Sequence, residues 1–209
     1  MIPAKRDPQT VDFFYFENRA WQRFGLVAGL DEAGRGAWAG PVAAAAVIFE
    51  PGVTIAGVDD SKVLTPKKRE FLFEKICASA KAYGIGMVGP EKIDQINILE
   101  ASKLAMLKAL EMMSCRPEHL LIDGLIHLET DVSQEAIVDG DALSFSIAAA
   151  SILAKVARDR VMVELDKTYP GYGFASHKGY GTKEHRRNLT KLGCTLIHRR
   201  SYRPVARVL

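Results

Sequence analysis

The stretch from Leu26 to Phe49, LVAGLDEAGRGAWAGPVAAAAVIF, decides the fold. Its first apolar run, Leu26–Leu30, predicts a buried strand that ends at Asp31. A glycine-rich loop follows, and Pro41 argues against a helix after that loop, because proline lacks the N–H group that a helix interior needs. The run Val42–Phe49 therefore predicts a second strand directly after the first.

Helices and strands alternate over the rest of the chain. Thr65 and Pro66 predict the start of a helix that runs to about Ala82, with Thr65 as its N-cap and Pro66 at its first position. Two longer helices are predicted from apolar residues at helical spacing and from a run of alanines that allows close approach to a sheet, at 91–113 and 146–166. The other predicted elements are strands at 83–88, 119–122 and 136–138 and a helix at 183–192. This order predicts an α/β fold whose mixed sheet has its active site beyond the strand ends.

Acidic residues stand where three of the predicted strands end. Asp31 and Glu32 follow LVAGL, Asp123 follows HLLI, and Asp139 and Asp141 follow EAIV. If these strands are neighbours, the carboxylates converge in one cleft and repel one another, and divalent cations would relieve that repulsion. The four carboxylates of Asp31, Glu32, Asp123 and Asp141 match two Mg²⁺ ions, since Mg²⁺ prefers oxygen ligands and suits a phosphate substrate. An Asp after a strand is also a common turn former or helix cap, and the pattern leaves that alternative open.

The loop Gly34-Arg35-Gly36 directly follows the first acidic pair. Its glycines let backbone N–H groups approach a ligand closely, and Arg35 adds a charge for a phosphate. The same residues match a dinucleotide-binding fingerprint, which is the rival interpretation. We reject it because that fingerprint opens a helix, whereas Pro41 and a strand-like run follow here.

Charge is distributed unevenly along the 209 residues. Residues 177–209 carry nine of the 28 Lys and Arg and one of the 25 acids, a net charge of +8, whereas the rest of the chain carries −5. A basic end on an otherwise acidic chain indicates a polyanionic partner, although a solvated basic surface would give the same pattern.

The length suits one domain, and we expect an N-terminal extension at 1–24, packed as a short helix, followed by a single catalytic domain at 25–209. The cysteines, Cys77, Cys115 and Cys194, lie far apart without a CxxC spacing. We therefore expect three small buried side chains and neither a zinc site nor a disulfide framework. Neither a signal peptide nor an apolar run of membrane-spanning length is visible, so we expect a cytoplasmic protein with no membrane contact.

Together these motifs resemble the ribonuclease HII family, the type 2 ribonucleases H. GLDEAGRG at 29–36 is similar to the opening signature of that family. Six further blocks resemble those of the family in its order: DDSK at 59–62, LIDG at 121–124, GD at 140–141, AAASILAKVARD at 148–159, YGFASHKGYGT at 172–182 and HRRSYRP at 198–204. Related type 3 enzymes carry an extra N-terminal domain and a Lys in the glycine loop, so this length and Arg35 indicate type 2.

The resemblance implies that Asp31, Glu32 and Asp123 are metal-binding acids and that Asp141 is the fourth acid of the active site. Asp139 and Asp159 compete for that fourth role, and an ion pair or a place on the helix surface is the expected use of Asp159.

The resemblance also implies nucleic-acid contacts. Gly34, Arg35 and Gly36 would grip the backbone at the RNA–DNA junction and sense the 2′-hydroxyl, which distinguishes RNA from DNA. Tyr180 would stack on the sugar of the following deoxynucleotide. Lys62 and Lys178 would contact phosphates, and Val63 stands where the family commonly has a second lysine. Lys155 and Arg158 would order the acids or bind backbone.

The fold implied is ribonuclease H-like: a mixed five-stranded sheet flanked by helices, with a helical C-terminal part. The activity implied is hydrolysis of the RNA strand of RNA·DNA hybrids, and of duplex DNA 5′ to an embedded ribonucleotide, by a monomer using two Mg²⁺ or Mn²⁺ ions. The products would carry 5′-phosphate and 3′-hydroxyl ends. Two alternatives stay open: another nuclease of this fold, such as a junction resolvase, and a hybrid-binding protein without activity.

Overall fold

A five-stranded mixed sheet forms the centre of the structure, a computed structural model that describes residues 12–209. The strand order is β3-β2-β1-β4-β5, with β1–β2 and β2–β3 antiparallel and β1–β4 and β4–β5 parallel. The strands are β1 (Val27–Ala33), β2 (Val42–Ile48), β3 (Ala82–Val88), β4 (His119–Asp123) and β5 (Ser133–Ile137). The predicted α/β fold with a mixed five-stranded sheet is confirmed.

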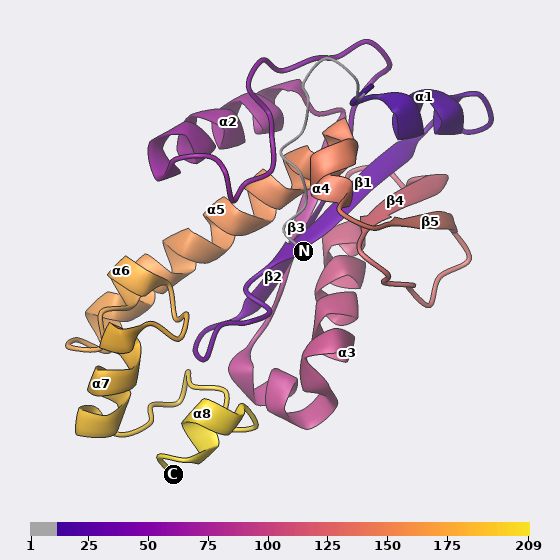
Figure 1. Cartoon of the computed structure of the whole chain (residues 1–209). Helices are drawn as coiled ribbons and strands as arrows, with labels where there is room; N and C mark the ends of the chain where they lie inside the picture. The colour runs from indigo at the N-terminus through magenta and orange to yellow at the C-terminus, as the bar shows by residue number, and fades with distance from the viewer. Residues whose placement is uncertain (1–11) are drawn as a thin grey trace, which may run out of the picture.

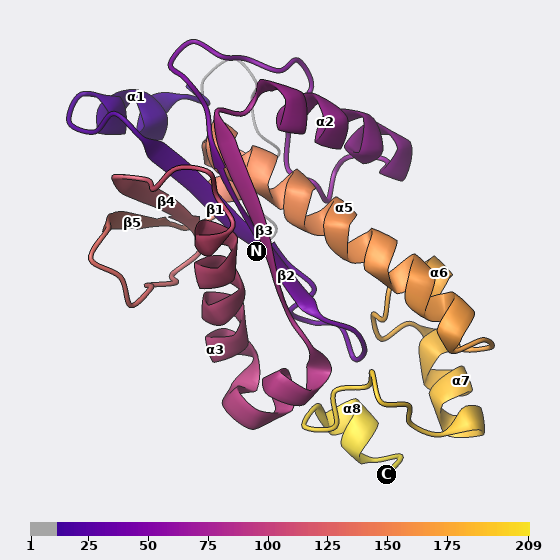
Figure 2. The ribbon, with the colours of Figure 1, turned by 180° about the vertical axis from the view of Figure 1, so that it is seen from behind.

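Helices cover both faces of this sheet, as Figures 1 and 2 show from opposite sides. Helix α3 (Pro90–Glu111) packs on β3 and β2, whereas α5 (Phe145–Thr168) packs on β1 and β2 from the other face, with α2 (Pro66–Ser79) beside it. Small residues allow this close packing. A Cβ at Gly86 would lie 2.2 Å from the carbonyl oxygen of Ala105 in α3, and one at Gly29 would lie 2.3 Å from the backbone of Ser146 in α5.

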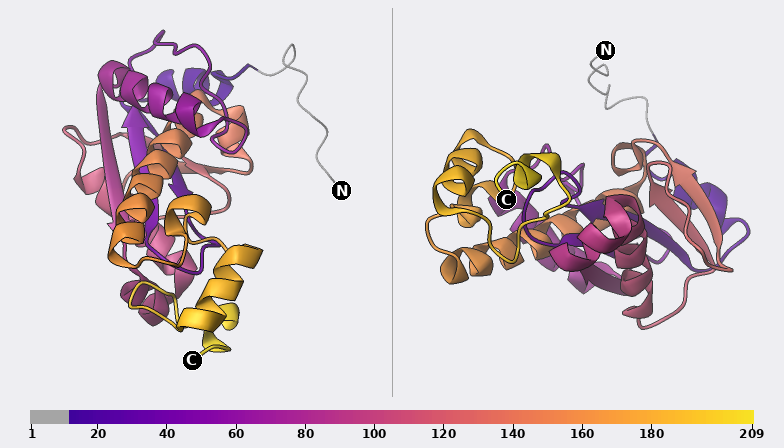
Figure 3. Two further views of the ribbon diagram at one scale, coloured as in Figure 1. Left: turned by 90° about the vertical axis from the view of Figure 1, so that its left-hand side faces the viewer. Right: turned by 90° about the horizontal axis from the view of Figure 1, so that it is seen from below.

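Short helices form both ends of the described chain. Helix α1 (Tyr15–Trp21) packs beside the sheet, and Phe14 stacks on Phe145 with ring centroids 4.7 Å apart. The expected packing of the N-terminal aromatic residues is thus confirmed for residues 12–24, and residues 1–11 lie outside the described part. At the other end, α6 (Phe174–His177), α7 (Lys183–Leu192) and α8 (Arg203–Ala206) gather beyond one end of the sheet (Figure 3).

Three predicted boundaries differ from the structure. Strand β1 continues to Ala33, so Asp31 and Glu32 lie inside the strand, because their backbones still pair with Ala45 and Ala44 of β2. Helix α2 ends at Ser79, because β3 begins at Ala82. Strand β5 spans Ser133–Ile137, earlier than the predicted 136–138, because it pairs in parallel with β4 from His119 onward.

The long predicted helix at 91–113 contains a break. Asn97 has a φ of 68°, and its side-chain oxygen accepts hydrogen bonds from the N–H groups of Leu99 and Glu100. Its ψ of 169° is far from the helical value, so the helix is interrupted there, and its side chain caps the second part of the helix.

The three cysteines are free but half-buried, so the expectation of three small buried side chains was wrong as to their burial. Among residues 12–209, no helix is long and apolar enough to cross a membrane.

Candidate active site

The register of the two central parallel strands brings Asp31 and Asp123 together. Leu30 of β1 pairs with Ile122 of β4, and both side chains lie in the core beneath α3. Because successive residues of a strand point to opposite faces, the next residues, Asp31 and Asp123, both point toward the face covered by α5. Asp31 is 4% exposed.

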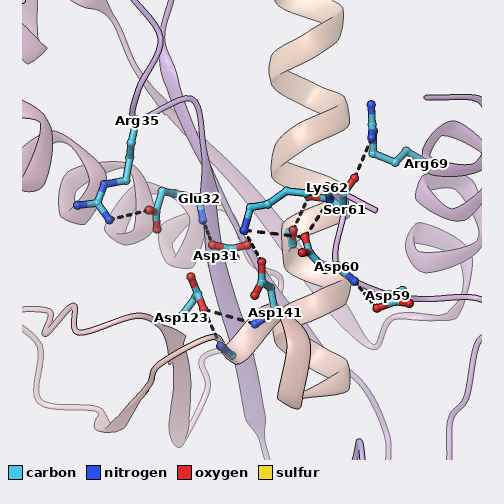
Figure 4. Close-up of polar contacts among 12 residues, drawn as sticks. Asp31, Glu32, Arg35, Asp59, Asp60, Ser61, Lys62, Arg69, Asp123 and Asp141 are labelled. Carbon is cyan, nitrogen blue, oxygen red and sulfur yellow. Dashed lines mark hydrogen bonds and ion pairs between the residues drawn. The ribbon is translucent and has the colours of Figure 1, made fainter. Parts of the chain in front are cut away.

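A short helix places Asp141 against the same pair. The chain leaves β5, turns at Asp139 with a φ of 54°, and enters α4 (Gly140–Leu143). The N–H groups of Gly140 and Asp141 point at the Asp123 carboxylate, with N···O distances of 2.8 and 3.4 Å. Asp141 is 4% exposed. Figure 4 shows the carboxylates of Asp31, Asp123 and Asp141 turned toward one another.

The loop before α2 adds a cation and a further acid. Lys62 donates to Asp141 at 2.6 Å and lies 3.9 Å from Asp60 (Figure 4). The loop is fixed from behind, since Ser61 accepts a hydrogen bond from Ser151 of α5 and Arg69 of α2 donates to the Ser61 carbonyl. Asp60 was missed from the sequence as a member of this cluster, although it stands inside the DDSK block.

Burial and neighbouring charges disfavour the ionised forms of four of the carboxyls at this site. The pKa of Asp31 is raised well above its usual range by burial and then by the charges of Glu32, Asp123 and Asp141. The pKa of Asp123 is raised by burial and by Asp141, and that of Asp60 mainly by burial. Burial also raises the pKa of Glu32, although Arg35 beside it acts in the opposite direction.

Lys62 partly balances this excess of negative charge. Burial alone would lower its pKa, but the pKa is raised because the ammonium group hydrogen-bonds to Asp141 and lies near Asp60 and Asp31.

The donor set suits a hard divalent cation. All four predicted acids offer carboxylate oxygens, which Mg²⁺ and Mn²⁺ prefer, and the buried Oε2 atom of Glu32 has no hydrogen-bond partner. As the side chains stand, no three acidic, histidine or cysteine residues within 12–209 are arranged to hold a metal ion together. Three of the four acids have other partners in this structure. Asp141 accepts a hydrogen bond from Lys62, Glu32 lies 3.1 Å from Arg35, and Asp123 accepts backbone N–H groups.

The glycine loop lies directly beside these acids, and its two glycines have different reasons to be glycine. Gly34 has a φ of 96°, and a Cβ there would lie 2.0 Å from Nε of Arg158. Gly36 has no positive φ, and a Cβ there would meet nothing within 4 Å. The fold therefore requires a glycine at 34 but gives no internal reason for one at 36, which leaves exposed backbone free for close approach by a ligand.

Two buried arginines hold the glycine loop to the C-terminal helices. Arg158 donates to the carbonyl oxygens of Ala39, Pro41 and Lys178, and Arg199 donates to those of Arg35 and Gly40. Burial lowers the pKa of Arg158 to about 10. Arg158 is 0% exposed and its guanidinium is fully engaged, so it neither orders the acids nor binds nucleic-acid backbone, and the prediction for this residue was wrong.

Tyr180 lies on the turn between α6 and α7, and two cationic side chains lie close to its ring. Lys155 Nζ and the Arg158 guanidinium lie 5.3 and 5.2 Å from the ring centroid. Tyr180 also lines a cavity of about 720 Å³ between α2, α5 and α6, which the predicted acids do not line. Lys178 borders the same cavity, but its ammonium group hydrogen-bonds to the Ala175 carbonyl, so it is not brought to the acids.

Asp139, Asp141 and Asp159, the candidates for the fourth acid of the active site, lie in different surroundings. Asp139 is exposed on the turn before α4, whereas Asp141 is buried against Asp123. Asp159 lies further along α5 and pairs with Lys155 at 2.7 Å, which confirms the predicted ion pair.

The chain is similar in sequence and in fold to known proteins. The sequence matches the model of the family described as Ribonuclease HII over residues 28–205. It is 48% identical over 205 residues to the ribonuclease HII of Geotalea uraniireducens, which covers 98% of this chain and 94% of that protein. Its fold is similar to that of the ribonuclease H2 from Pyrococcus horikoshii OT3, with a TM-score of 0.74, 28% identity and coverage of 88% and 96% of the two chains. Bst-RNase HIII in complex with Mn²⁺ shares the fold at 16% identity, with a TM-score of 0.65 over 88% of this chain and 68% of that one.

Proposed function

The chain belongs to the ribonuclease HII family, and from that premise we propose that it cuts the RNA strand of RNA·DNA hybrids and cuts duplex DNA on the 5′ side of an embedded ribonucleotide. Membership makes it a ribonuclease H, a hydrolase of phosphodiester bonds. The proposed products carry 5′-phosphate and 3′-hydroxyl ends, and the proposed role is the removal of ribonucleotides from DNA and of RNA from hybrids.

The observation that carries this proposal is the group of carboxyls with raised pKa values that β1 and β4 bring together. A fold that only had to be stable would not gather Asp31, Glu32 and Asp123 where burial and neighbouring carboxylates raise their pKa values. Such an arrangement is typical of a site that becomes balanced when divalent cations bind.

We propose that these four carboxylates hold two Mg²⁺ or Mn²⁺ ions. When bound, two such ions lower the barrier of hydrolysis by activating a water and by stabilising the charge on the departing oxygen. The chain itself supplies the frame: β1 and β4 fix Asp31 and Asp123, and the N–H groups of α4 orient the Asp123 carboxylate. The Mn²⁺ complex of Bst-RNase HIII is a property of that protein, and it supports the same class of ion here.

We assign recognition of the ribonucleotide to the glycine loop and Tyr180. The open backbone at Gly36 lets a sugar approach closely, and a main-chain group there is suited to hydrogen-bond a 2′-hydroxyl. Arg35 is exposed and lies beside Glu32, where its guanidinium can bind a phosphate next to the scissile bond. Tyr180, held by Lys155 and Arg158, presents a flat apolar surface to the neighbouring deoxyribose.

Lys62 has two uses in this proposal. It balances Asp141 in the structure, and 73% of its side chain is exposed, so it can turn to a backbone phosphate when the duplex binds. Val63 beside it is exposed and uncharged, which removes one cation from this contact.

The decisive experiment uses a labelled DNA duplex that contains one ribonucleotide, with Mg²⁺ or Mn²⁺, a metal-free control and an all-DNA control. A single metal-dependent cut 5′ to the ribonucleotide is expected, and Asp123→Asn should abolish it while duplex binding is largely retained. Cleavage of long hybrids alone would reject the junction assignment.

The same experiment separates the alternatives. Cleavage of branched DNA that contains no RNA would favour a junction resolvase. Hybrid binding without any cleavage in either metal would favour a non-catalytic binding protein.

A further inference from the structure

A second, separate hollow lies between α7 and α8. It has a volume of about 320 Å³, and its lining combines an indole, a hydroxyl and three guanidinium groups, from Trp38, Thr190, Arg186, Arg203 and Arg207. The remaining lining residues are apolar, and no acidic residue lines it. Figures 1 and 3 place α7 and α8 together at the C-terminal end of the molecule, below the sheet.

Some exposed arginines of the chain are paired with acids, whereas the three arginines of this hollow are not paired with any acid of residues 12–209. Arg19, Arg116 and Arg160 each form an ion pair with a carboxylate, in two of these cases with the acid more than 80 residues away in sequence. Within residues 12–209, none of Arg186, Arg203 and Arg207 forms an ion pair. Three unpaired cations around one hollow create a positive potential that favours an anion.

The floor of the hollow is rigid. Trp38 is 9% exposed. Its backbone N–H donates to the Gly179 carbonyl at 2.8 Å, and its backbone carbonyl accepts from the backbone N–H of Arg199 at 2.8 Å. The Arg186 guanidinium lies 5.4 Å from the centroid of the Trp38 ring, which restrains that arginine over the indole. A cationic group that is held before binding loses less conformational entropy when a ligand arrives.

Trp38 also packs against the residues of the proposed recognition site. Trp38 follows Gly36 by two residues, so this lining residue of the hollow is joined to the glycine loop by a short piece of chain. Gly181, next to Tyr180, packs so tightly on the indole that a Cβ there would lie 2.2 Å from it. A duplex held by the glycine loop and Tyr180 therefore passes close to the hollow.

We propose that this hollow binds a backbone phosphate of the duplex away from the scissile bond and acts as a second anchor for the substrate. The proposal rests on the proposed function and extends it. Arginine suits this ligand because its planar group of donors matches two phosphate oxygens at once. The lack of acids in the lining argues against a cationic ligand.

The test compares two sets of substitutions that remove the same charge from the same end of the molecule. The first set removes the lining arginines: Arg186→Gln, Arg203→Gln and Arg207→Gln. The matched set removes three exposed cations of α7 that do not line the hollow: Lys183→Gln, Arg187→Gln and Lys191→Gln. Duplex affinity is measured by fluorescence anisotropy over a range of salt concentrations, with Asp123→Asn present throughout so that no cleavage occurs.

We expect the lining set to weaken duplex binding by roughly tenfold or more and to reduce the slope of log Kd against log salt by about one, as loss of one phosphate contact would. The matched set should weaken binding several-fold less. Shortening the duplex from one end should remove the difference between the two sets, because a short duplex no longer reaches the hollow. With Asp123 restored, the cleavage rate at saturating substrate should be unchanged in both sets.

Equal losses in the two sets would overturn the proposal, because they would reduce the hollow to part of a diffuse basic surface. Unchanged binding in the lining set would overturn it too and would point to another anion, such as an acidic peptide. If the triple set unfolds, Arg207→Gln against Arg187→Gln repeats the comparison with one charge each. Failure of the proposed function is seen separately, since binding of an all-DNA duplex reports on the hollow even if wild-type protein cuts nothing.

Discussion

At the scale of single residues, Asp31 shows that the active site lowers the stability of the folded protein. The side chain is buried beside three other carboxyls, and its pKa is raised well above the usual range. A carboxyl whose folded pKa is raised lowers stability at every pH above its unfolded pKa of about 3.9, because the folded state must then hold a charge that it disfavours.

Asp31→Asn should therefore raise the metal-free stability at pH 7 by roughly 1–2 kcal/mol while abolishing cleavage. The gain should disappear below about pH 4, where the wild-type carboxyl is protonated in both states. Urea unfolding at pH 7.5 and pH 3.5 measures both effects. Asp131→Asn is the matched control, because Asp131 is an exposed acid outside the site and its pKa is lowered by Arg116. A loss of stability in Asp31→Asn at pH 7 would contradict the interpretation of the cluster.

Tyr180 is a second residue whose role can be isolated. Tyr180→Ala should slow cleavage at a single embedded ribonucleotide more than cleavage of a continuous hybrid, because only the first substrate depends on recognition of the following deoxynucleotide. Tyr180→Phe keeps the ring over Lys155 and Arg158 and should retain most of the activity on both substrates. Rates on the two substrates decide the matter, and equal losses in Tyr180→Ala would remove this residue from junction recognition.

At the scale of elements, α1 is attached to the active-site region by one buried carboxyl. Glu17 is 1% exposed, and its Oε1 atom accepts hydrogen bonds from the Ser144 hydroxyl and from the N–H and hydroxyl of Ser146. These donors lie at the N-terminus of α5, where a negative charge is favoured. Ser144 also ends α4, the helix of Asp141, so the N-terminal segment supports the short helix that carries an acid of the site.

Glu17→Ala should lower the free energy of unfolding by about 2–4 kcal/mol, because it leaves several buried donors without an acceptor. Glu50→Ala, which removes an exposed acid paired with Lys81, should change it far less. Urea unfolding of both variants at pH 7 measures the difference. If Glu17→Ala were no more destabilising than Glu50→Ala, α1 would be an appendage and not part of the cooperative fold.

At the scale of the whole molecule, three buried histidines link the C-terminal helices to the recognition turn. His177 Nδ1 accepts from the Gly179 N–H, and His198 Nδ1 accepts from the Thr195 N–H. The third, His185, donates from Nδ1 to the Tyr180 carbonyl and accepts at Nε2 from His198. Each ring can satisfy these bonds as a neutral imidazole, and burial lowers the pKa of His185 and of His198 to about 4.

This network predicts a loss of stability in acid. Because the folded pKa lies below the unfolded value of about 6.5, the unfolded chain binds more protons between the two values. The neutral histidines therefore contribute their full stabilisation above about pH 6.5. As the pH falls toward 4, the free energy of unfolding declines by an amount on the order of 3 kcal/mol. Urea unfolding of His185→Asn should show a flatter pH dependence across this window than wild type. His127→Asn, which changes an exposed histidine, should leave the pH dependence of stability unchanged. The same pH dependence in wild type and in both variants would contradict the assignment of this effect to the buried histidines.

The sequence by itself determined the elements and the acids. Hydrophobic periodicity, the Thr65–Pro66 helix start and the positions of Asp31 and Asp123 in the chain are local properties, and α7 begins and ends where the pattern predicts. Tertiary structure decided which residues meet. Pairing with β2 extended β1 through Glu32, the β1–β4 register placed Asp31 beside Asp123, and burial turned Arg158 from an expected ligand contact into a support for the glycine loop. Asp60, Glu17 and the three arginines beside Trp38 act through neighbours distant in sequence. No local pattern encodes such contacts, because pKa shifts and buried hydrogen bonds arise only after the chain has packed.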